Sequence, residues 1–211
     1  MLRDFADGRR WMVEGTKVFL DAVVGLDEGA FGESTGLPGW TRKHLVAHVA
    51  ANADALGNLV HWAATGIHTP MYATSKERAA GIARGPGLTA AALREWLQRS
   101  AESLEQAMTQ LSPVQWEHEV VTAQGRTVPS TEIPWLRARE VCVHTVDLGL
   151  DVTFADLPSG FNAALYEDIR TKRGMADPPA ELADAPLDQV TAWLAGRPHL
   201  LERAPAIGPW L

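Results

Sequence analysis

A carboxylate and an imidazole stand four residues apart in the segment "PWLRAREVCVHTVDLG", at Glu140 and His144. Residues at this spacing lie on the same face of a helix, so both side chains can reach one point beside the helix axis. The surrounding residues are largely apolar, and a buried carboxylate or imidazole is unfavourable unless it is paired or bound to a cation. A divalent metal bound by both groups would remove the two penalties together.

Such a metal site needs a third protein ligand, because catalytic zinc takes three His or carboxylate ligands and keeps a fourth position open. His48 is the best candidate among the seven histidines, since it lies in the apolar stripe of a predicted helix. His44 follows two basic residues in the first turn of that helix, where we expect solvent exposure. A dinuclear site is disfavoured, because this helix offers no matching carboxylate.

The same residues also allow a purely structural interpretation. An inward-facing histidine on a helix is commonly a hydrogen-bonded core residue, and Glu140 can pair with Arg137, with Arg139 or with His48 itself. A two-residue motif at positions i and i+4 is weakly specific, so the spacing alone does not decide between a metal site and an ion pair. Both interpretations stay open at this point.

The single cysteine, Cys142, excludes an intramolecular disulfide, which agrees with a reducing compartment. Cys142 lies between two valines without a flanking base, so we expect an inert buried thiol and not a nucleophile. On the helix it also points away from His144, because positions two apart do not share a face.

Charge and hydropathy exclude several classes of partner. The formal net charge is -7 and the basic residues are spread along the chain, which argues against nucleic acid. No apolar run approaches the length of a membrane span, and the N-terminus does not resemble a signal peptide. We therefore expect a cytoplasmic protein with no membrane partner.

Helical spacing of apolar residues dominates the first two-thirds of the chain and predicts four long helices. Thr41 and Thr89 are favourable N-caps of the second and third helices. Pro134 is a favoured first-turn residue of the fourth helix, and Gly149 is favoured where that helix ends. The predicted helices cover residues 2–26, 41–65, 89–111 and 134–149, with a glycine-rich loop at 25–39.

The segment between the third and fourth helices lacks helical spacing, and its β-prone pieces around "QGRT" predict a hairpin or extended loop. Four helices with one long crossover form a four-helix bundle. The chain after residue 151 is rich in proline and contains two short predicted helices, at 162–173 and 187–195. We expect a mainly α protein, with the bundle at 1–151 and a small C-terminal α/β or α unit at 152–211 packed on it.

Two motifs together resemble a known family. The stretch "LPGWTRKHLVAHVA" is followed about ninety residues later by "IPWLRAREVCVHTVDLG", and this pairing resembles the mycothiol-dependent maleylpyruvate isomerases of the DinB-like superfamily. The intermediate "MYATSKERAAGIARGPGLTAAALREWL" extends the resemblance over most of residues 1–150. The resemblance implies a DinB-like bundle in which a divalent metal, usually zinc, is held by His48, Glu140 and His144.

The resemblance also implies a reaction and a second substrate. Family members use a low-molecular-weight thiol, which is mycothiol in actinobacteria, and its sulfur can occupy the open position of the metal. Zinc favours the thiolate, which is the nucleophilic form. The implied reaction is cis–trans isomerisation of maleylpyruvate to fumarylpyruvate in gentisate breakdown, in which the thiolate adds to the double bond and leaves after rotation.

The implied substrate is a dianion, so a guanidinium is expected near the metal. The resemblance points to an arginine of the C-terminal unit, and Arg197 in "WLAGRP" is the nearest match for this catalytic role. A solvent-facing charge at a helix C-terminus is the alternative for Arg197. Arg137 and Arg139 are rivals on the helix that carries the metal ligands. Asp147 either orients the His144 imidazole or serves as a capping or solvent-facing residue.

Two other functions compete with the isomerase, because one fold hosts several activities. A mycothiol S-transferase acting on another electrophile would use the same three ligands without a diacid clamp. Arginines near the metal favour the isomerase, whereas an apolar pocket favours the transferase. A non-catalytic metal-binding stress protein would be favoured if His44 or His61 filled the open metal position.

Overall fold

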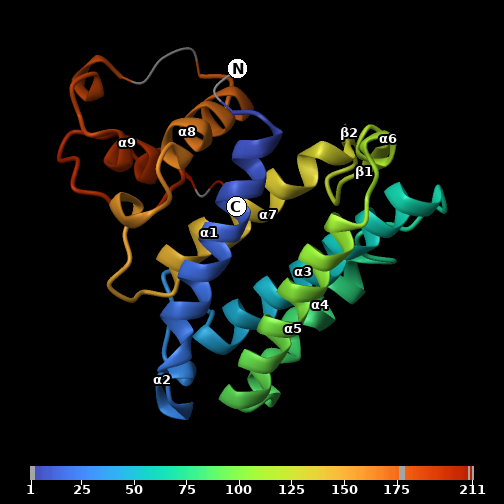
Figure 1. Ribbon diagram of the computed structural model, residues 1–211. Coiled ribbons are helices and arrows are strands. Elements are labelled where there is room, and N and C mark those ends of the chain that lie inside the picture. The colour runs from blue at the N-terminus through green and yellow to red at the C-terminus, as the bar shows by residue number, and fades with distance from the viewer. Residues whose placement is uncertain (1–2, 176–178, 209, 211) are drawn as a thin grey trace.

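Four long helices form the framework of the molecule (Figure 1). The computed structural model describes residues 3–175, 179–208 and 210. α1 packs along α7, and α3 packs along both α5 and α7, which confirms the predicted bundle. No described helix has a stretch long and apolar enough to cross a membrane. The framework helices are α1 (Phe5–Val24), α3 (Arg42–Thr65), α5 (Ala90–Thr109) and α7 (Ile133–Asp147).

Local capping explains where these helices begin and end. The Asp4 carboxylate accepts a hydrogen bond from the Asp7 amide, and the Asp7 carboxylate accepts one from the Asp4 amide, so α1 starts with a capping box. The Thr89 hydroxyl oxygen accepts a backbone amide at the start of α5, as predicted. Pro134 lies in the first turn of α7, and Gly149 follows its end with φ of 66°, a left-handed conformation that favours glycine.

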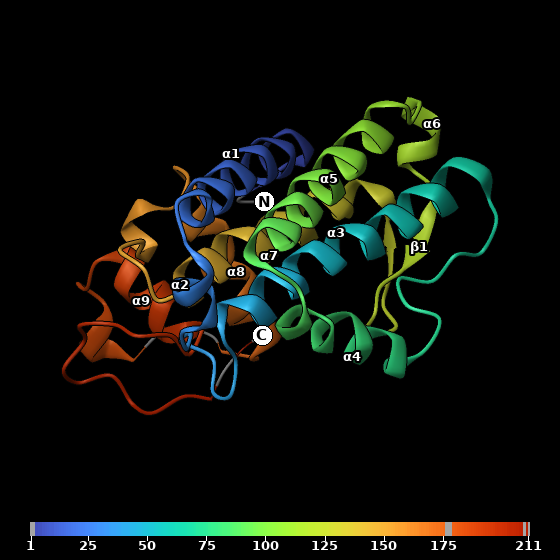
Figure 2. The same cartoon turned by 90° about the horizontal axis from the view of Figure 1, so that it is seen from below.

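The connection between α5 and α7 is the predicted long crossover. It contains the short helix α6 (Pro113–Trp116) and an antiparallel hairpin, in which Val120 of β1 lies opposite Val128 of β2. The strands are β1 (Glu119–Val121) and β2 (Thr127–Pro129), and the turn η2 (Ser130–Glu132) leads into α7. Figure 2 shows the hairpin reaching from α6 toward α4, so it borders the same side of the bundle as that helix.

Besides α6, two short helices lie where no helix was predicted. The segment 25–39 was expected to be a loop, but it contains α2 (Glu28–Gly32), because the Asp27 carboxylate accepts the Ala30 amide and caps one turn. The second is α4 (Ser75–Ala83), which is followed by the turn η1 (Gly85–Gly87). η1 passes against α3, where a Cβ on Gly85 would lie 2.5 Å from the Lys43 carbonyl oxygen.

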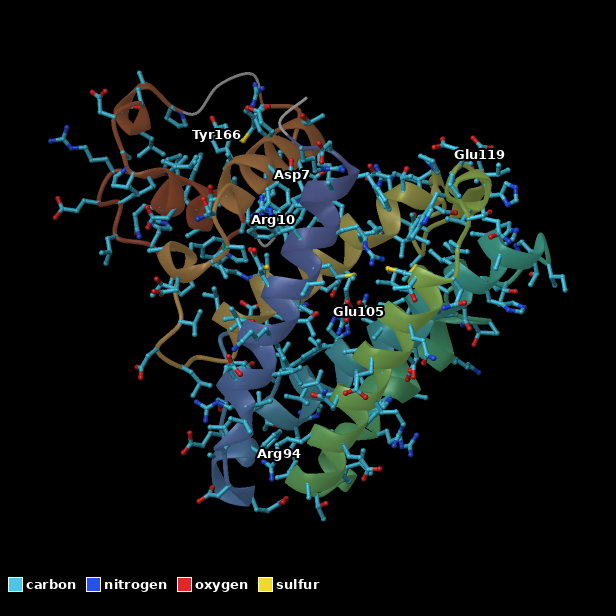
Figure 3. The ribbon with its side chains drawn as sticks, viewed as in Figure 1. Asp7, Arg10, Arg94, Glu105, Glu119 and Tyr166 are labelled. Atoms are coloured by element: carbon cyan, nitrogen blue, oxygen red, sulfur yellow. The ribbon has the colours of Figure 1, made fainter. Side chains whose placement is uncertain are left out.

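The C-terminal segment is helical within the described residues. Its helices α8 (Phe161–Lys172) and α9 (Leu187–Leu194) pack on each other, and the single turns are η3 (Phe154–Asp156) and η4 (Ala180–Leu182). Trp11 of α1 contacts Phe161 of α8 and donates a hydrogen bond to the Ser159 carbonyl at 2.9 Å. Arg10 also donates to Ser159, and Figure 3 shows Arg10 on the side of α1 that faces these helices. The domain division at residue 151 stays a prediction.

α1 and α7 approach each other closely at Gly15. A Cβ at this position would lie 2.5 Å from the Cys142 sulfur, so only glycine permits the observed packing. Cys142 is fully buried, as predicted, and burial raises the pKa of its thiol. These contacts make Cys142 a packing residue of the α1–α7 interface.

Candidate metal centre and its cavity

His48 of α3 meets Glu140 and His144 of α7 where the two helices pack together. The Nε2 atoms of His48 and His144 lie 3.1 and 3.3 Å from the same Glu140 carboxylate oxygen. The two imidazole rings have centroids 5.0 Å apart and are nearly perpendicular. Both histidines are buried, and Glu140 is partly buried. The structure therefore brings together the three residues that the sequence suggested as ligands.

Asp147 fixes the orientation of one of these imidazoles. Its carboxylate oxygen lies 2.8 Å from His144 Nδ1, and a carboxylate can only accept, so Nδ1 carries a proton. In neutral His144 the lone pair of Nε2 therefore faces the Glu140 carboxylate, which is unfavourable unless a proton or a cation lies between them. This donor set, with two imidazole nitrogens and one carboxylate, fits the ligand preferences of zinc.

The short distances in the cluster shift the pKa values of Glu140 and His144. Burial raises the pKa of Glu140, but hydrogen bonds from His144 and His48 outweigh it and hold the pKa well below its ordinary value. Burial lowers the pKa of His144, but Asp147 and Glu140 raise it to about 9. Without a metal the site therefore holds an ionised carboxylate beside a protonated imidazole, and a bound cation would take the place of that proton.

Arg197 reaches the centre from behind His144. Its Nε and Nη2 donate to the two oxygens of Asp147 at 2.8 and 2.9 Å, and its Nη1 donates to the Ala195 carbonyl at 2.8 Å. Arg197 is only 5% exposed, so the alternative of a solvent-facing charge is wrong. Asp147 is buried as well, which excludes the solvent-facing alternative for that residue. A chain of hydrogen bonds thus runs from Arg197 through Asp147 to His144.

A cavity of about 580 Å³ opens beside the centre, with His48 and Glu140 in its wall. α3 and α7 form one side, and the chain between α3 and α4 forms another. The turn of the hairpin, residues 121–125, closes a third side. Apolar side chains of the wall include Leu56, Met71 and Leu136. The cavity therefore offers a small molecule a partly apolar space next to the three clustered side chains.

Comparison with known proteins decides the family. The chain matches the family described as "Mycothiol maleylpyruvate isomerase N-terminal domain" over residues 13–149, the part that carries His48, Glu140 and His144. The chain belongs to this family.

Solved structures extend the similarity beyond that segment. A crystal structure of the mycothiol-dependent maleylpyruvate isomerase has 35% sequence identity and a TM-score of 0.89, and the match covers 99% of this chain and 98% of that chain. A histidine-to-alanine mutant of the same enzyme has 35% identity and a TM-score of 0.88, with the same coverage. No curated protein matches the chain. The predicted fold class, a DinB-like bundle with a C-terminal unit, is confirmed by these similarities.

The other histidines of this family member do not join the cluster. Within the part of the chain that the structure describes, His48, Glu140 and His144 are the grouped residues that could hold a metal ion. His44 lies in the first turn of α3, where its Nδ1 accepts the Thr41 amide. In the described chain, neither His44 nor His61 fills a fourth position.

The three candidate arginines have different surroundings. Arg137 is buried in the bundle, where its Nη1 donates to Val49 and Asn52 of α3. Burial lowers its pKa to about 10, so Arg137 stays charged at neutral pH. Of Arg137, Arg139 and Arg197, only Arg139 belongs to the described lining of the cavity. No local sequence pattern distinguishes these arginines, because their surroundings depend on contacts between α7 and the C-terminal segment, such as Arg139 with Asp168 and Asp147 with Arg197.

Proposed function

We propose that this chain is a mycothiol-dependent isomerase that converts maleylpyruvate into fumarylpyruvate, a step of gentisate breakdown, in the cytoplasm. The observation that carries the proposal is the cluster of His48, Glu140 and His144 at the wall of a cavity, in a chain of this family. The similarity of nearly the whole chain to an enzyme of that name supports the same reaction.

We propose zinc as the metal, held by the Nε2 atoms of the two histidines and by the Glu140 carboxylate. A bound divalent metal would lower the pKa of a thiol in the cavity and so supply a thiolate at neutral pH. Asp147 keeps the proton on Nδ1 of His144 and thereby directs Nε2 toward the metal. Arg197 balances the charge of Asp147 and fixes its carboxylate plane.

The thiol, when bound, supplies the chemistry of addition and elimination. Its sulfur forms a bond to one alkene carbon while the π electrons move toward the conjugated ketone. The remaining carbon–carbon single bond rotates, and the electrons return to form the trans alkene as the carbon–sulfur bond breaks. The thiol is regenerated, so the reaction needs no oxidant or reductant. The apolar residues of the cavity limit access of water to the substrate.

A product assay tests this proposal. Purified protein loaded with zinc is incubated with maleylpyruvate, with and without mycothiol, and the alkene protons are followed by NMR. We expect conversion of the cis into the trans compound only when the thiol is present. Absence of conversion with both zinc and thiol, or equal conversion without thiol, would reject the proposal.

The apolar part of the cavity wall favours one alternative, a mycothiol S-transferase that acts on a different electrophile. Leu56, Met71 and Leu136 could contact an apolar substrate, whereas the guanidinium of Arg139 in the same wall favours a carboxylate. The two functions differ in their products. A transferase accumulates a stable thioether and consumes the thiol, and an isomerase leaves the thiol concentration unchanged.

A further inference from the structure

Cations cluster around Arg139, which lines the cavity beside the candidate metal centre. Arg139 of α7 lines the cavity, and Asp168 of α8 pairs with both Arg139 and Lys172, at 2.8 and 2.9 Å. Burial and the neighbouring charges of Arg139 and Arg126 lower the pKa of Lys172, so these cations lie near one another. Asp168 is thus shared by two cations, with Arg126 close to them, so the part of the cavity at Arg139 is suited to an anion.

Arg139 is held firmly but retains free hydrogen-bonding capacity. It is 6% exposed, and its guanidinium carbon lies over the rings of Trp135 and Trp210, at 5.9 and 5.2 Å from their centroids. Nη1 donates to Asp168, while the buried Nε has no hydrogen-bond partner within the described chain. A guanidinium has five N–H donors in a fixed fork, so the pairing with Asp168 leaves donors for a second carboxylate.

The position of Arg139 on α7 places it beside Glu140 of the candidate metal centre. Leu136, Arg139 and Glu140 follow the i, i+3, i+4 spacing of one helix face, and all three line the cavity. A molecule that contacts the centre at Glu140 therefore occupies the same space that Arg139 borders. Arg197 is not among the described residues that line the cavity, and three of its five N–H groups already donate to Asp147 and Ala195.

We propose that Arg139 binds a carboxylate of the substrate and that Asp168 of α8 positions its guanidinium for this contact. The proposal rests on the proposed function, since it takes the substrate to be a small dicarboxylate. It assigns the carboxylate-binding residue to the helix that also carries Glu140 and His144. The C-terminal segment then contributes to substrate binding through Asp168, which aims the guanidinium, and through Trp210, which covers it.

Steady-state kinetics with Arg139→Gln test the contact directly. We expect the KM for maleylpyruvate to rise roughly 10- to 100-fold, the range for loss of a charge-assisted hydrogen bond. The KM for mycothiol and the zinc content should stay unchanged, because neither depends on this guanidinium. Arg99→Gln is the matched control, since Arg99 is an exposed residue of α5 paired with Glu95, and it should leave all three values unchanged.

A binding measurement gives a readout that does not require turnover. The probes are the saturated analogue of the substrate with both carboxylates free and its two monomethyl esters, measured by calorimetry. We expect the wild-type protein to bind one of the two esters roughly 10- to 100-fold more weakly than the diacid. Arg139→Gln should bind the diacid and this ester equally, whereas Arg99→Gln should discriminate like the wild type.

Asp168 is a positioning residue in this proposal, and a double-mutant cycle tests it. Asp168→Asn should raise the KM for the diacid less than Arg139→Gln does, with kcat unchanged. Added to Arg139→Gln, it should have no further effect on that KM. An equal additional rise in the double variant would show that Asp168 acts independently, and this outcome would overturn the positioning role.

The results separate this proposal from the proposed function. An active wild type whose Arg139→Gln variant keeps the same KM and the same ester discrimination would overturn the carboxylate contact and leave the isomerase intact. A wild type without thiol-dependent isomerisation would reject the isomerase, while the ester comparison would still report on Arg139. If Arg139→Gln does not fold, Arg139→Lys keeps the charge but loses the fork, and we expect it to weaken the discrimination without removing it.

Discussion

Replacing Arg197 by methionine removes one half of a buried ion pair. Arg197 is 5% exposed and its partner Asp147 is 3% exposed, and two hydrogen bonds of 2.8 and 2.9 Å join them. Methionine retains much of the apolar stem, so the change mainly removes charge and hydrogen bonds. Without Arg197 the buried Asp147 carboxylate keeps only His144 as a partner among the described side chains, and breaking a buried ion pair in this way typically destabilises a protein by about 3–5 kcal/mol.

We therefore expect Arg197→Met to lower the free energy of unfolding by about 3–5 kcal/mol. Urea unfolding followed by circular dichroism should show a lower midpoint with an unchanged slope, and Tm should fall by roughly 6–20 °C for a chain of this size. Arg99→Met is the control, because this exposed arginine pairs only with Glu95 among the described residues, and it should change stability by less than about 0.5 kcal/mol.

A second substitution separates the loss of charge balance from the loss of packing. In the zinc-loaded protein His144 would be a neutral ligand, so there Asp147→Asn in the Arg197→Met background removes a carboxylate that has lost its cation, and the double variant should be more stable than Arg197→Met alone. A decrease of less than about 1 kcal/mol in the free energy of unfolding of Arg197→Met would refute the reasoning, because breaking a buried ion pair costs more than this. A double variant less stable than the single variant would refute it as well.

Zinc affinity of Arg197→Met distinguishes two roles for this residue. If Arg197 acts through Asp147 on His144, zinc affinity should fall roughly 10- to 100-fold, as is typical when a partner behind a ligand is lost. If Arg197 contacts the substrate, as the family resemblance implied, turnover should fall while zinc affinity stays unchanged. Titration with a competing chelator measures the difference.

Three further predictions follow from the same structure. His48→Ala should abolish zinc retention, measured by elemental analysis, whereas His44→Ala should not, and the reverse result would show that the wrong histidine was assigned. Cys142→Ala should keep most thiol-dependent activity and lose only about 1 kcal/mol of stability, and inactivation with fold and metal intact would make Cys142 the nucleophile. The pKa of His144 is raised from 6.5 to about 9 in the metal-free protein, so its stabilising effect is complete below pH 6.5 and is lost as the pH rises through 9. Urea midpoints of the metal-free protein should therefore fall across this interval while zinc affinity rises, and a midpoint that rises with pH would contradict the assignment.

The framework helices could be predicted to within a few residues, because their apolar spacing is long and their ends carry specific residues. Thr89 and Pro134 mark the starts of α5 and α7 where the sequence indicated them. The short helices α2 and α4 escaped prediction, since five and nine residues carry too little periodicity to identify a helix. α2 depends on one capping residue, Asp27, within a glycine-rich segment.

The candidate site was predictable only in part. Helix geometry alone placed Glu140 beside His144, and the apolar stripe of the second helix singled out His48. The pairing of Asp147 with Arg197 spans 50 residues and depends on how the C-terminal helices pack, so no local pattern could reveal it. The same holds for Arg139 and Asp168, which lie on different helices. Tertiary packing therefore decides which of the three candidate arginines faces the cavity.

The most direct test of the central claim is X-ray absorption spectroscopy of the zinc-loaded protein before and after addition of mycothiol. We expect a first shell of nitrogen and oxygen at about 2.0–2.2 Å, from His48, Glu140, His144 and water, which gains one sulfur at about 2.3 Å when the thiol is added. A shell that stays free of sulfur in the presence of mycothiol, or an unchanged zinc spectrum in His48→Ala, would contradict a metal centre that binds zinc through these residues and activates an external thiol.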